Sequence, residues 1–93
     1  MCLGVPGIIR ERWEEAGALL ARGDFAGEER TIRLNYLPDL RVGDWVITHA
    51  GFALTRLTPA DAAETLRTMH SVGLLPEESA GPALAEALGQ VAS

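Results

Sequence analysis

Two residues of this chain have side chains suited to holding a soft metal. One of them, Cys2, is the only cysteine and directly follows Met1. Removal of Met1, which a small second residue favours, would leave Cys2 with a free α-amine beside its thiol. An adjacent ammonium group favours the thiolate, the nucleophilic and metal-binding form. We therefore expect Cys2 to hold a soft metal fragment; the alternative is a small buried hydrophobe, a common role of free cysteine.

The second candidate, His49, lies in residues 44–50, a segment rich in Trp, Val, Ile and Thr that predicts a strand. Strand alternation places its side chain on the face of Trp45 and Ile47. Imidazole is a borderline ligand for iron and can hold a proton near neutral pH. The alternative is an ordinary strand histidine bonded to a neighbour. The other histidine, His70, is interpreted as a surface residue near the negative end of a helix.

Short strands must position these residues. Residues 3–13 have an irregular β pattern that Pro6 and Gly7 bend, and residues 14–17 predict a turn. Residues 18–22 predict a buried strand, and Gly23-Asp24 predicts a turn. Residues 29–37 alternate, which predicts a half-buried strand, with three residues on its inner face: Ile32, Leu34 and Tyr36.

Structural roles are expected for the residues around the strand of His49. Gly43 and Asp44 predict a turn that Asp44 closes, so Asp44 is not interpreted as a general base. Gly51 is expected at a bulge or a barrel corner. Residues 52–57 then predict a further strand, with Phe52 as a core anchor. Trp45 and Trp13 could each be core or interface residues.

The hydrophobic period changes after residue 57. Thr58 predicts an N-cap, Pro59 the first helical position, and Gly73 the helix end. Several short strands followed by a helix predict a mainly β protein, a small β-barrel with a C-terminal α-helix. This unit spans residues 1–75. Residues 76–93 form a tail with one apolar helical stripe, which predicts a short second helix or a partly ordered segment.

Two segments carry a family resemblance: Met-Cys-Leu-x-x-Pro-Gly at residues 1–7, and Gly-Asp-x-Val-x-x-His-x-Gly-Phe-Ala at residues 43–53. Together they resemble the HypC/HupF/HybG family of hydrogenase maturation chaperones. Residues 24–27 are similar to the family's Asp-Phe-x-Gly turn. The resemblance extends from Met1 to about Val72. One departure is that Ile8 and Ile9 stand where the family has a basic or amide residue, and Arg10 is the first such residue.

The resemblance implies an OB-like barrel and a role in assembling the [NiFe] hydrogenase active site. It implies that Cys2 and His49 handle an Fe(CN)2CO fragment, held transiently rather than as a tightly bound cofactor. It also implies complexes with a HypD-type scaffold protein and with the precursor of the hydrogenase large subunit. Four residues of the N-terminal segment are the expected partner contacts: Cys2, Leu3, Pro6 and Gly7.

Two other interpretations of Cys2 remain open. The first is a metal-free protein-binding barrel that holds the large-subunit precursor open, in which Cys2 makes only a contact. The second is a redox-sensing thiol, although the chain offers no resolving cysteine.

Composition excludes several other classes. The chain has 93 residues, which suits one domain, and a net charge of -5, which disfavours nucleic acids and anionic membranes. It lacks a phosphate loop, a Cys-x-x-Cys pair and a nucleophile elbow, so we expect no enzyme activity. Arg10, Glu11 and Arg12 interrupt any signal peptide, and no apolar run reaches the length of a membrane span. With a single cysteine, these features predict a cytoplasmic protein.

Overall fold

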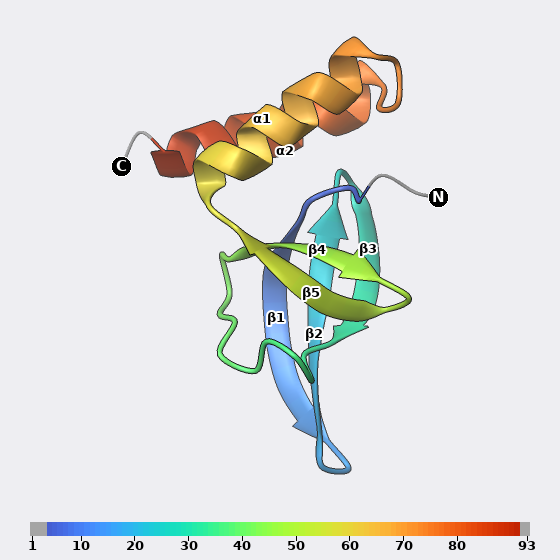
Figure 1. Cartoon of the computed structure of the whole chain (residues 1–93), viewed down its shortest axis with the longest axis vertical. Coiled ribbons are helices and arrows are strands. Elements are labelled where there is room, and N and C mark those ends of the chain that lie inside the picture. The colour runs from blue at the N-terminus through green and yellow to red at the C-terminus, as the bar shows by residue number, and fades with distance from the viewer. Residues whose placement is uncertain (1–3, 92–93) are drawn as a thin grey trace.

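The computed structural model describes residues 4–91 and shows a barrel covered at one end by a pair of helices (Figure 1). The strands are β1 (Gly7–Glu15), β2 (Ala18–Phe25), β3 (Glu28–Arg33), β4 (Trp45–His49) and β5 (Phe52–Leu57). The helices are α1 (Pro59–Ser71) and α2 (Glu77–Val91). The prediction of a mainly β chain with a small OB-like barrel and a C-terminal helix is confirmed.

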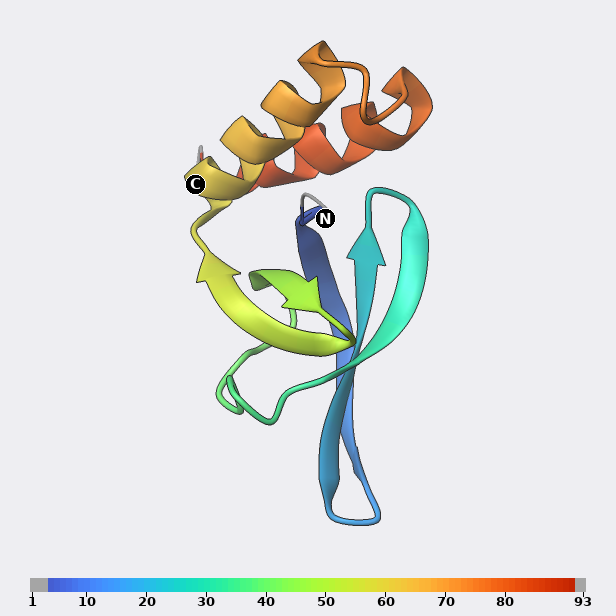
Figure 2. The ribbon, with the colours of Figure 1, turned by 45° about the vertical axis from the view of Figure 1, so that its right-hand side comes forward.

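The barrel closes in the order β1-β2-β3-β5-β4. Strands β1, β2 and β3 form an antiparallel meander, and β4 lies antiparallel to both β5 and β1. Between β3 and β5 the closure consists of one parallel bridge, Arg33 to Phe52. Figure 2 shows β3 beside the β4–β5 hairpin, with the β1–β2 hairpin extending away from the helices.

Each of the three hairpins turns at an Ala-Gly pair. Both residues of each pair have positive φ, with values for alanine of 52° at Ala16, 54° at Ala26 and 55° at Ala50. Two consecutive positive φ angles are the pattern of a type I′ turn, whose twist matches that of the flanking strands. The turn expected over residues 14–17 is thus confined to Ala16 and Gly17, because β1 continues to Glu15.

Gly51 also belongs to a hairpin turn, so its assignment to a bulge or a barrel corner was wrong. Its φ is 85°, and it connects β4 directly to β5. The irregularity of this hairpin lies farther along, where Ile47 pairs with Thr55 but Thr48 pairs with Ala53. The extra residue is therefore Leu54 in β5, a position at which no glycine marks the bulge in the sequence.

The turn predicted at Gly23-Asp24 was wrong, because both residues lie inside β2. A Cβ atom on Gly23 would lie 2.7 Å from the Phe25 ring, and one on Gly7 would lie 2.2 Å from the same ring. These two glycines make room for the aromatic ring on neighbouring strands. The chain turns after Phe25 instead, where Asp24 Oδ1 accepts a hydrogen bond from Gly27 N at 2.8 Å. This contact confirms the Asp-Phe-x-Gly turn.

The strand expected over residues 29–37 ends at Arg33. Ile32 and Leu34 are buried as predicted, but Tyr36 is 65% exposed. The chain leaves the sheet after Leu34, so strand alternation no longer determines where Tyr36 points. Phe52 was also wrongly expected in the core: it is half-buried, and its ring lies 5.6 Å from the Tyr36 ring.

Two hydrophobic clusters stabilise the fold, and adjacent strand residues divide between them. Ile9 and Val46 point into the barrel, whereas Ile8 and Trp45 point toward the helices. This division follows from the alternation of side chains along β1 and β4. Trp45 is therefore a core residue. Trp13, on the protruding hairpin, is half-buried.

Helix α1 begins and ends as predicted. Thr58 Oγ1 accepts a hydrogen bond from Asp61 N at 3.1 Å, Pro59 opens the helix, and Gly73 follows its end with φ 83°. Such an N-cap contributes about 1 kcal/mol. His70 is exposed in the last turn, as expected, and its Nε2 lies 2.9 Å from Glu77 Oε1. No helix in the described part of the chain is long and apolar enough to cross a membrane.

Helix α2 is a full element of the fold rather than a loose tail. It spans 15 residues and packs against α1 and the barrel, where Ala87 is fully buried. The N–H group of the Trp45 ring donates to Gln90 Oε1 at 3.0 Å, and Gln90 Nε2 donates to the carbonyl oxygen of Gly43 at 3.2 Å. The boundary at residue 75 thus falls between two helices that pack together.

Candidate functional site

A large open cavity of about 920 Å³ lies at one side of the barrel. Its walls come from segments far apart in the sequence: the N-terminal segment, the β2–β3 turn with β3, the β4–β5 turn and the start of α2. The residues that line the cavity include Gly4, Val5, Phe25, Glu28, Arg30, Thr31, Ile32, Thr48, His49, Leu75 and Ser79.

Gly4 fixes the position of the N-terminal segment on this wall. A Cβ atom at Gly4 would lie 2.3 Å from Cγ2 of Ile47, so any side chain there would push the segment away from β4. The glycine thus allows the backbone to lie directly against the strand that carries His49. We did not expect this role for Gly4 from the sequence, because the contact depends on the barrel topology.

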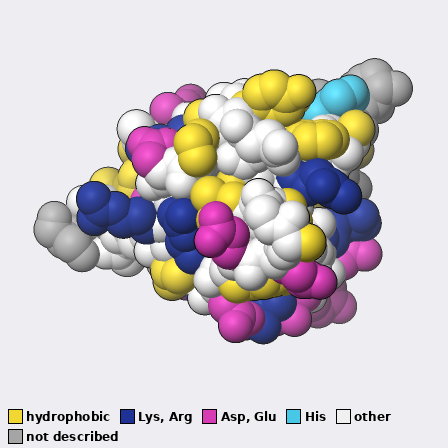
Figure 3. Space-filling model, turned by 90° about the horizontal axis from the view of Figure 1, so that it is seen from below, with side chains coloured by type: hydrophobic (Ala, Val, Ile, Leu, Met, Phe, Trp, Pro, Cys, Tyr) yellow, Lys and Arg dark blue, Asp and Glu magenta, His cyan; other side chains and the backbone are white. Residues whose placement is uncertain are grey.

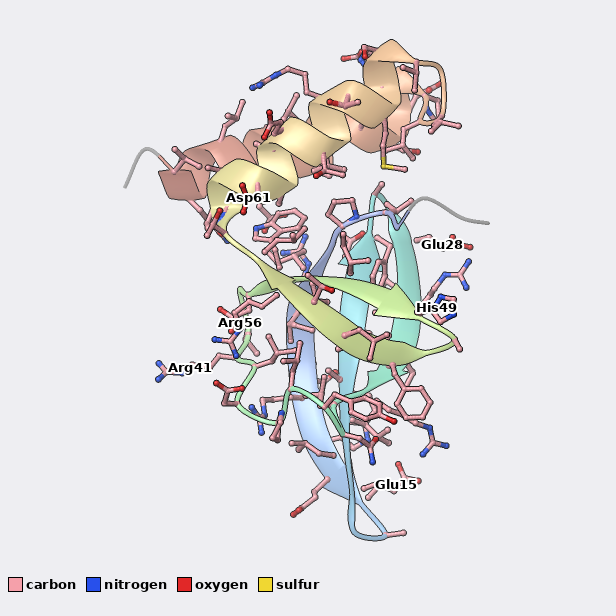
Figure 4. All side chains as sticks on the ribbon, viewed as in Figure 1. Glu15, Glu28, Arg41, His49, Arg56 and Asp61 are labelled. Atoms are coloured by element: carbon pink, nitrogen blue, oxygen red, sulfur yellow. The ribbon has the colours of Figure 1, made fainter. Side chains whose placement is uncertain are left out.

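His49 is exposed at the end of β4 and lines the same cavity as Gly4. Figure 4 shows His49 and Glu28 on the same side of the barrel, at the ends of two different strands. Cys2 and Leu3 lie outside the described residues. The pairing of Cys2 with His49 stays a prediction; among the described residues, Gly4 and His49 line the same cavity.

Pro6 and Gly7, two of the expected partner contacts, are buried. Gly7 pairs with Val46 at the junction of β1 and β4, and its missing side chain makes room for Phe25. Any contribution of these two residues to partner binding would therefore act through the path of the N-terminal segment.

Gly43 and Asp44 have structural roles at the start of β4. Asp44 Oδ2 accepts a hydrogen bond from Arg41 N at 2.9 Å, and Asp44 N donates to Arg41 O at 3.0 Å. Gly43 has a φ of 97° and donates its N–H to Ile9 O at 2.8 Å. The interpretation of Asp44 as the residue that closes the turn is confirmed.

The cavity wall carries few groups that could ligate a metal. Glu28 Oε1 accepts a hydrogen bond from Arg30 at 2.9 Å, so this carboxylate already has a cationic partner. Within residues 4–91, no three His, Asp or Glu side chains gather as a metal site. Within this part of the chain, His49 could therefore hold a metal only together with ligands from elsewhere.

The start of α2 was missed as part of this site. Leu75 and Ser79 line the cavity opposite the β-hairpins, although they lie at the edge of the segment interpreted as a tail. Its only sequence signal was the apolar helical stripe, which predicts a helix but not its partner. Residues of the β2–β3 turn were missed as wall residues for the same reason.

An arginine clamp holds α2 in place beside the cavity. Arg10 donates to both carboxylate oxygens of Glu86, at 2.5 and 2.7 Å, and to Asp24 Oδ2 at 3.1 Å. The hydrogen bonds from Arg10 to Glu86, and secondarily those to Asp24, raise the pKa of the guanidinium above its usual value. Such a bidentate pair fixes geometry as well as adding attraction.

The end of the barrel far from the helices shows no large area of one chemical kind. In Figure 3, hydrophobic side chains alternate there with arginine, aspartate and glutamate side chains. Nothing on this face suggests an extended basic surface of the kind that nucleic-acid binding requires.

Comparisons with known proteins agree on one family. The model of the HupF/HypC family matches residues 1–69. The chain is 43% identical over 77 residues to a hydrogenase maturation factor HypC of Azotobacter chroococcum mcd 1, covering 83% of this chain and 88% of that protein. It is 38% identical over 76 residues to the HypC of Synechocystis sp., covering 80% and 100%. It is 33% identical over 78 residues to that of Escherichia coli K12, covering 77% and 82%.

Proposed function

We propose that this chain, which belongs to the HupF/HypC family, serves in hydrogenase maturation as a carrier of iron and not as an enzyme. Its cargo is the Fe(CN)2CO fragment of the [NiFe] active site. Relatives named hydrogenase maturation factor support the general role. The finer role is supported by the cavity that Gly4 and His49 both line. Gly4 follows Cys2 by two positions in the sequence.

The Cys2 thiolate holds the iron fragment, and His49 offers an imidazole nitrogen at the cavity wall. Transfer proceeds by ligand exchange: the iron–sulfur bond to Cys2 breaks as a bond to a receiving thiolate forms. Cys2 then regains its thiolate or thiol form, and the oxidation state of iron does not change. A site with few protein ligands suits such a carrier, because the cargo must leave it.

The carrier has two partners in this scheme. A HypD-type scaffold protein, working in the cytoplasm, is where the iron acquires its cyanide and carbon monoxide ligands. The precursor of the hydrogenase large subunit then receives the fragment. The barrel provides the surface that both partners contact, and Gly4 and Val5 line its cavity.

Complementation of a strain that lacks the chain's own gene tests this function. Cys2→Ser and Cys2→Ala should both abolish hydrogenase activity, since a hydroxyl is a poor ligand for soft metals. The variants should remain folded, because a residue at the chain end adds little packing. Normal maturation by Cys2→Ser would instead support a metal-free barrel that holds the precursor open.

A further inference from the structure

Within residues 4–91, strand β3 has an edge that the barrel leaves largely unpaired. It pairs with β2 along its whole length, from Phe25↔Glu28 to Leu20↔Arg33. On its other side, the pairing with β5 consists of the single bridge at Arg33, where Arg33 N donates to Gly51 O at 2.8 Å. Toward its N-terminal end β3 therefore separates from the β4–β5 hairpin.

The backbone groups that face this edge follow from the alternation of the ladder. Leu34 N donates to Leu19 O at 3.0 Å, so Leu34 faces β2, whereas Arg33 faces β5. In an antiparallel pair, successive residues alternate in this way. Thr31 and Glu29 thus direct their N–H and C=O groups outward, on the side where the described pairing to β5 has ended. Both residues are exposed.

The cavity lies along this edge. Thr31 and Ile32 line it from β3, and Thr48 and His49 line it from the opposite hairpin. The cavity has a volume of about 920 Å³, and a strand added to β3 would lie about 4.8 Å from it. Its inner wall is apolar, since it includes Val5, Phe25 and Ile32, whereas its outer rim is polar.

The occupant that fits this groove is a single extended peptide. A second copy of the chain would bring β2 beside its own β3, so two strands rather than one would have to enter between β3 and the β4–β5 hairpin, whose Thr48 and His49 line the opposite wall. A strand in this position would turn alternate side chains toward the apolar wall and toward the polar rim. Main-chain hydrogen bonds to an edge strand are an established way to bind such peptides.

We propose that an extended segment of the client protein, with apolar residues at alternate positions, adds to β3 through the backbone groups of Glu29 and Thr31. The identity of the client, the hydrogenase large-subunit precursor, rests on the proposed function. Binding there places the client's chain along the same cavity as Gly4 and His49, and so next to the N-terminal segment that carries the cargo.

A proline at position 31 tests the edge directly. Thr31→Pro removes an outward N–H group and leaves the ladder to β2 intact, because Thr31 does not donate to β2. We expect its affinity for the purified precursor to fall by about tenfold or more. Thr31→Val is the matched control: it changes the side chain but keeps the N–H group, so it should lose much less affinity than Thr31→Pro. Far-UV circular dichroism and thermal melting establish that both variants fold.

Hydrogen exchange tests the same edge without a substitution. Addition of the precursor should slow exchange of the Thr31 and Glu29 amides by about tenfold or more, while the Ile32 amide, already bonded within the ladder, changes little. Equal affinities of Thr31→Pro and Thr31→Val, with no protection of Thr31, would overturn the edge proposal and leave the proposed function standing. Absence of any binding between the unmodified chain and the precursor would overturn both.

Discussion

At the scale of single residues, the three Ala-Gly turns carry backbone strain. Alanine in the left-handed region costs roughly 1–2 kcal/mol, a cost that asparagine reduces by local hydrogen bonding. Ala16 lies at the exposed tip of the β1–β2 hairpin, with φ 52°. The sequence predicts a turn at this position but not its backbone conformation, because alanine rarely adopts a positive φ.

Ala16→Asn should therefore stabilise the protein by about 0.5–1 kcal/mol, because asparagine tolerates positive φ better than alanine does. Thermal melting or urea unfolding measures the change. Glu14→Asn, in the extended backbone of the adjoining strand, is the control and should not stabilise. A lower melting temperature for Ala16→Asn would contradict the assignment of a type I′ turn.

His49→Ala should impair delivery of iron more than it impairs stability. His49 is exposed, so its removal should change the free energy of unfolding by less than about 0.5 kcal/mol. His70→Ala is a matched control, because His70 is an exposed histidine outside the cavity lining. Hydrogenase activity in complemented cells and melting temperature are measured together. Equal activity of the two variants would remove His49 from the site.

At the scale of secondary-structure elements, α2 packs on the outside of the barrel. The helix covers the outward faces of β1 and β4. Its Ala87 is buried there, and its Gln90 accepts a hydrogen bond from the Trp45 ring. A stripe of apolar residues is the local signal for this helix, whereas its polar contacts Arg10–Glu86 and Trp45–Gln90 join residues 76 and 45 positions apart. Pairings over such separations have no local sequence signal.

Removal of residues 76–93 should destabilise the protein strongly. The truncation exposes the apolar cluster around Ile8 and Trp45 and frees Arg10 from Glu86. A loss of about 3 kcal/mol would lower the melting temperature by roughly 12–24 °C. Trp45 fluorescence and melting curves of the truncated and full-length chains provide the measurement. Unchanged stability would show that α2 is dispensable for the fold.

At the scale of the whole molecule, one surface ion pair should make stability depend on pH. Arg56 donates to Asp39 Oδ1 at 2.8 Å, and this bond, with a backbone hydrogen bond at Asp39, lowers the pKa of that carboxyl group. A lowered pKa in the folded state stabilises the fold above the unfolded pKa of about 3.9, and this stabilisation is lost as pH falls through the folded pKa.

Asp39→Asn should accordingly reduce the free energy of unfolding near pH 7, with a difference from the original chain that shrinks at about pH 3. The effect should be small, because the pair is exposed and screened by salt. Urea unfolding of both proteins at the two pH values measures it. A difference that grows toward acid pH would contradict the direction of the Asp39 shift.

Local signals predicted most of the fold. The cap at Thr58, the burial of Ile32 and Leu34 and the β-rich segment before His49 each depend on neighbours in sequence, and these three features were confirmed. The errors at Gly23 and Phe52 have a different origin. Gly23 makes room for a ring of its own sheet, and Phe52 packs on Tyr36 outside the barrel, so both depend on tertiary contacts.

The candidate site was predictable only in part. Motif residues identified Cys2 and His49, but the cavity also needs Gly4 against Ile47, the β2–β3 turn and the start of α2. These walls meet because the barrel closes in the order β1-β2-β3-β5-β4. The order of strands in space is a property of the whole molecule, which individual motifs do not encode.

The proposal that Cys2 carries the Fe(CN)2CO fragment is tested by infrared spectroscopy and iron analysis of the chain co-purified with its HypD-type scaffold protein. We predict bound iron and absorption bands of cyanide and carbonyl ligands in the original complex. Each chain is then released from the scaffold and measured alone. The released original chain should keep these bands, and the released Cys2→Ser chain should lack them. Bands and iron retained by the released Cys2→Ser chain, or absent from the released original chain, would contradict the claim.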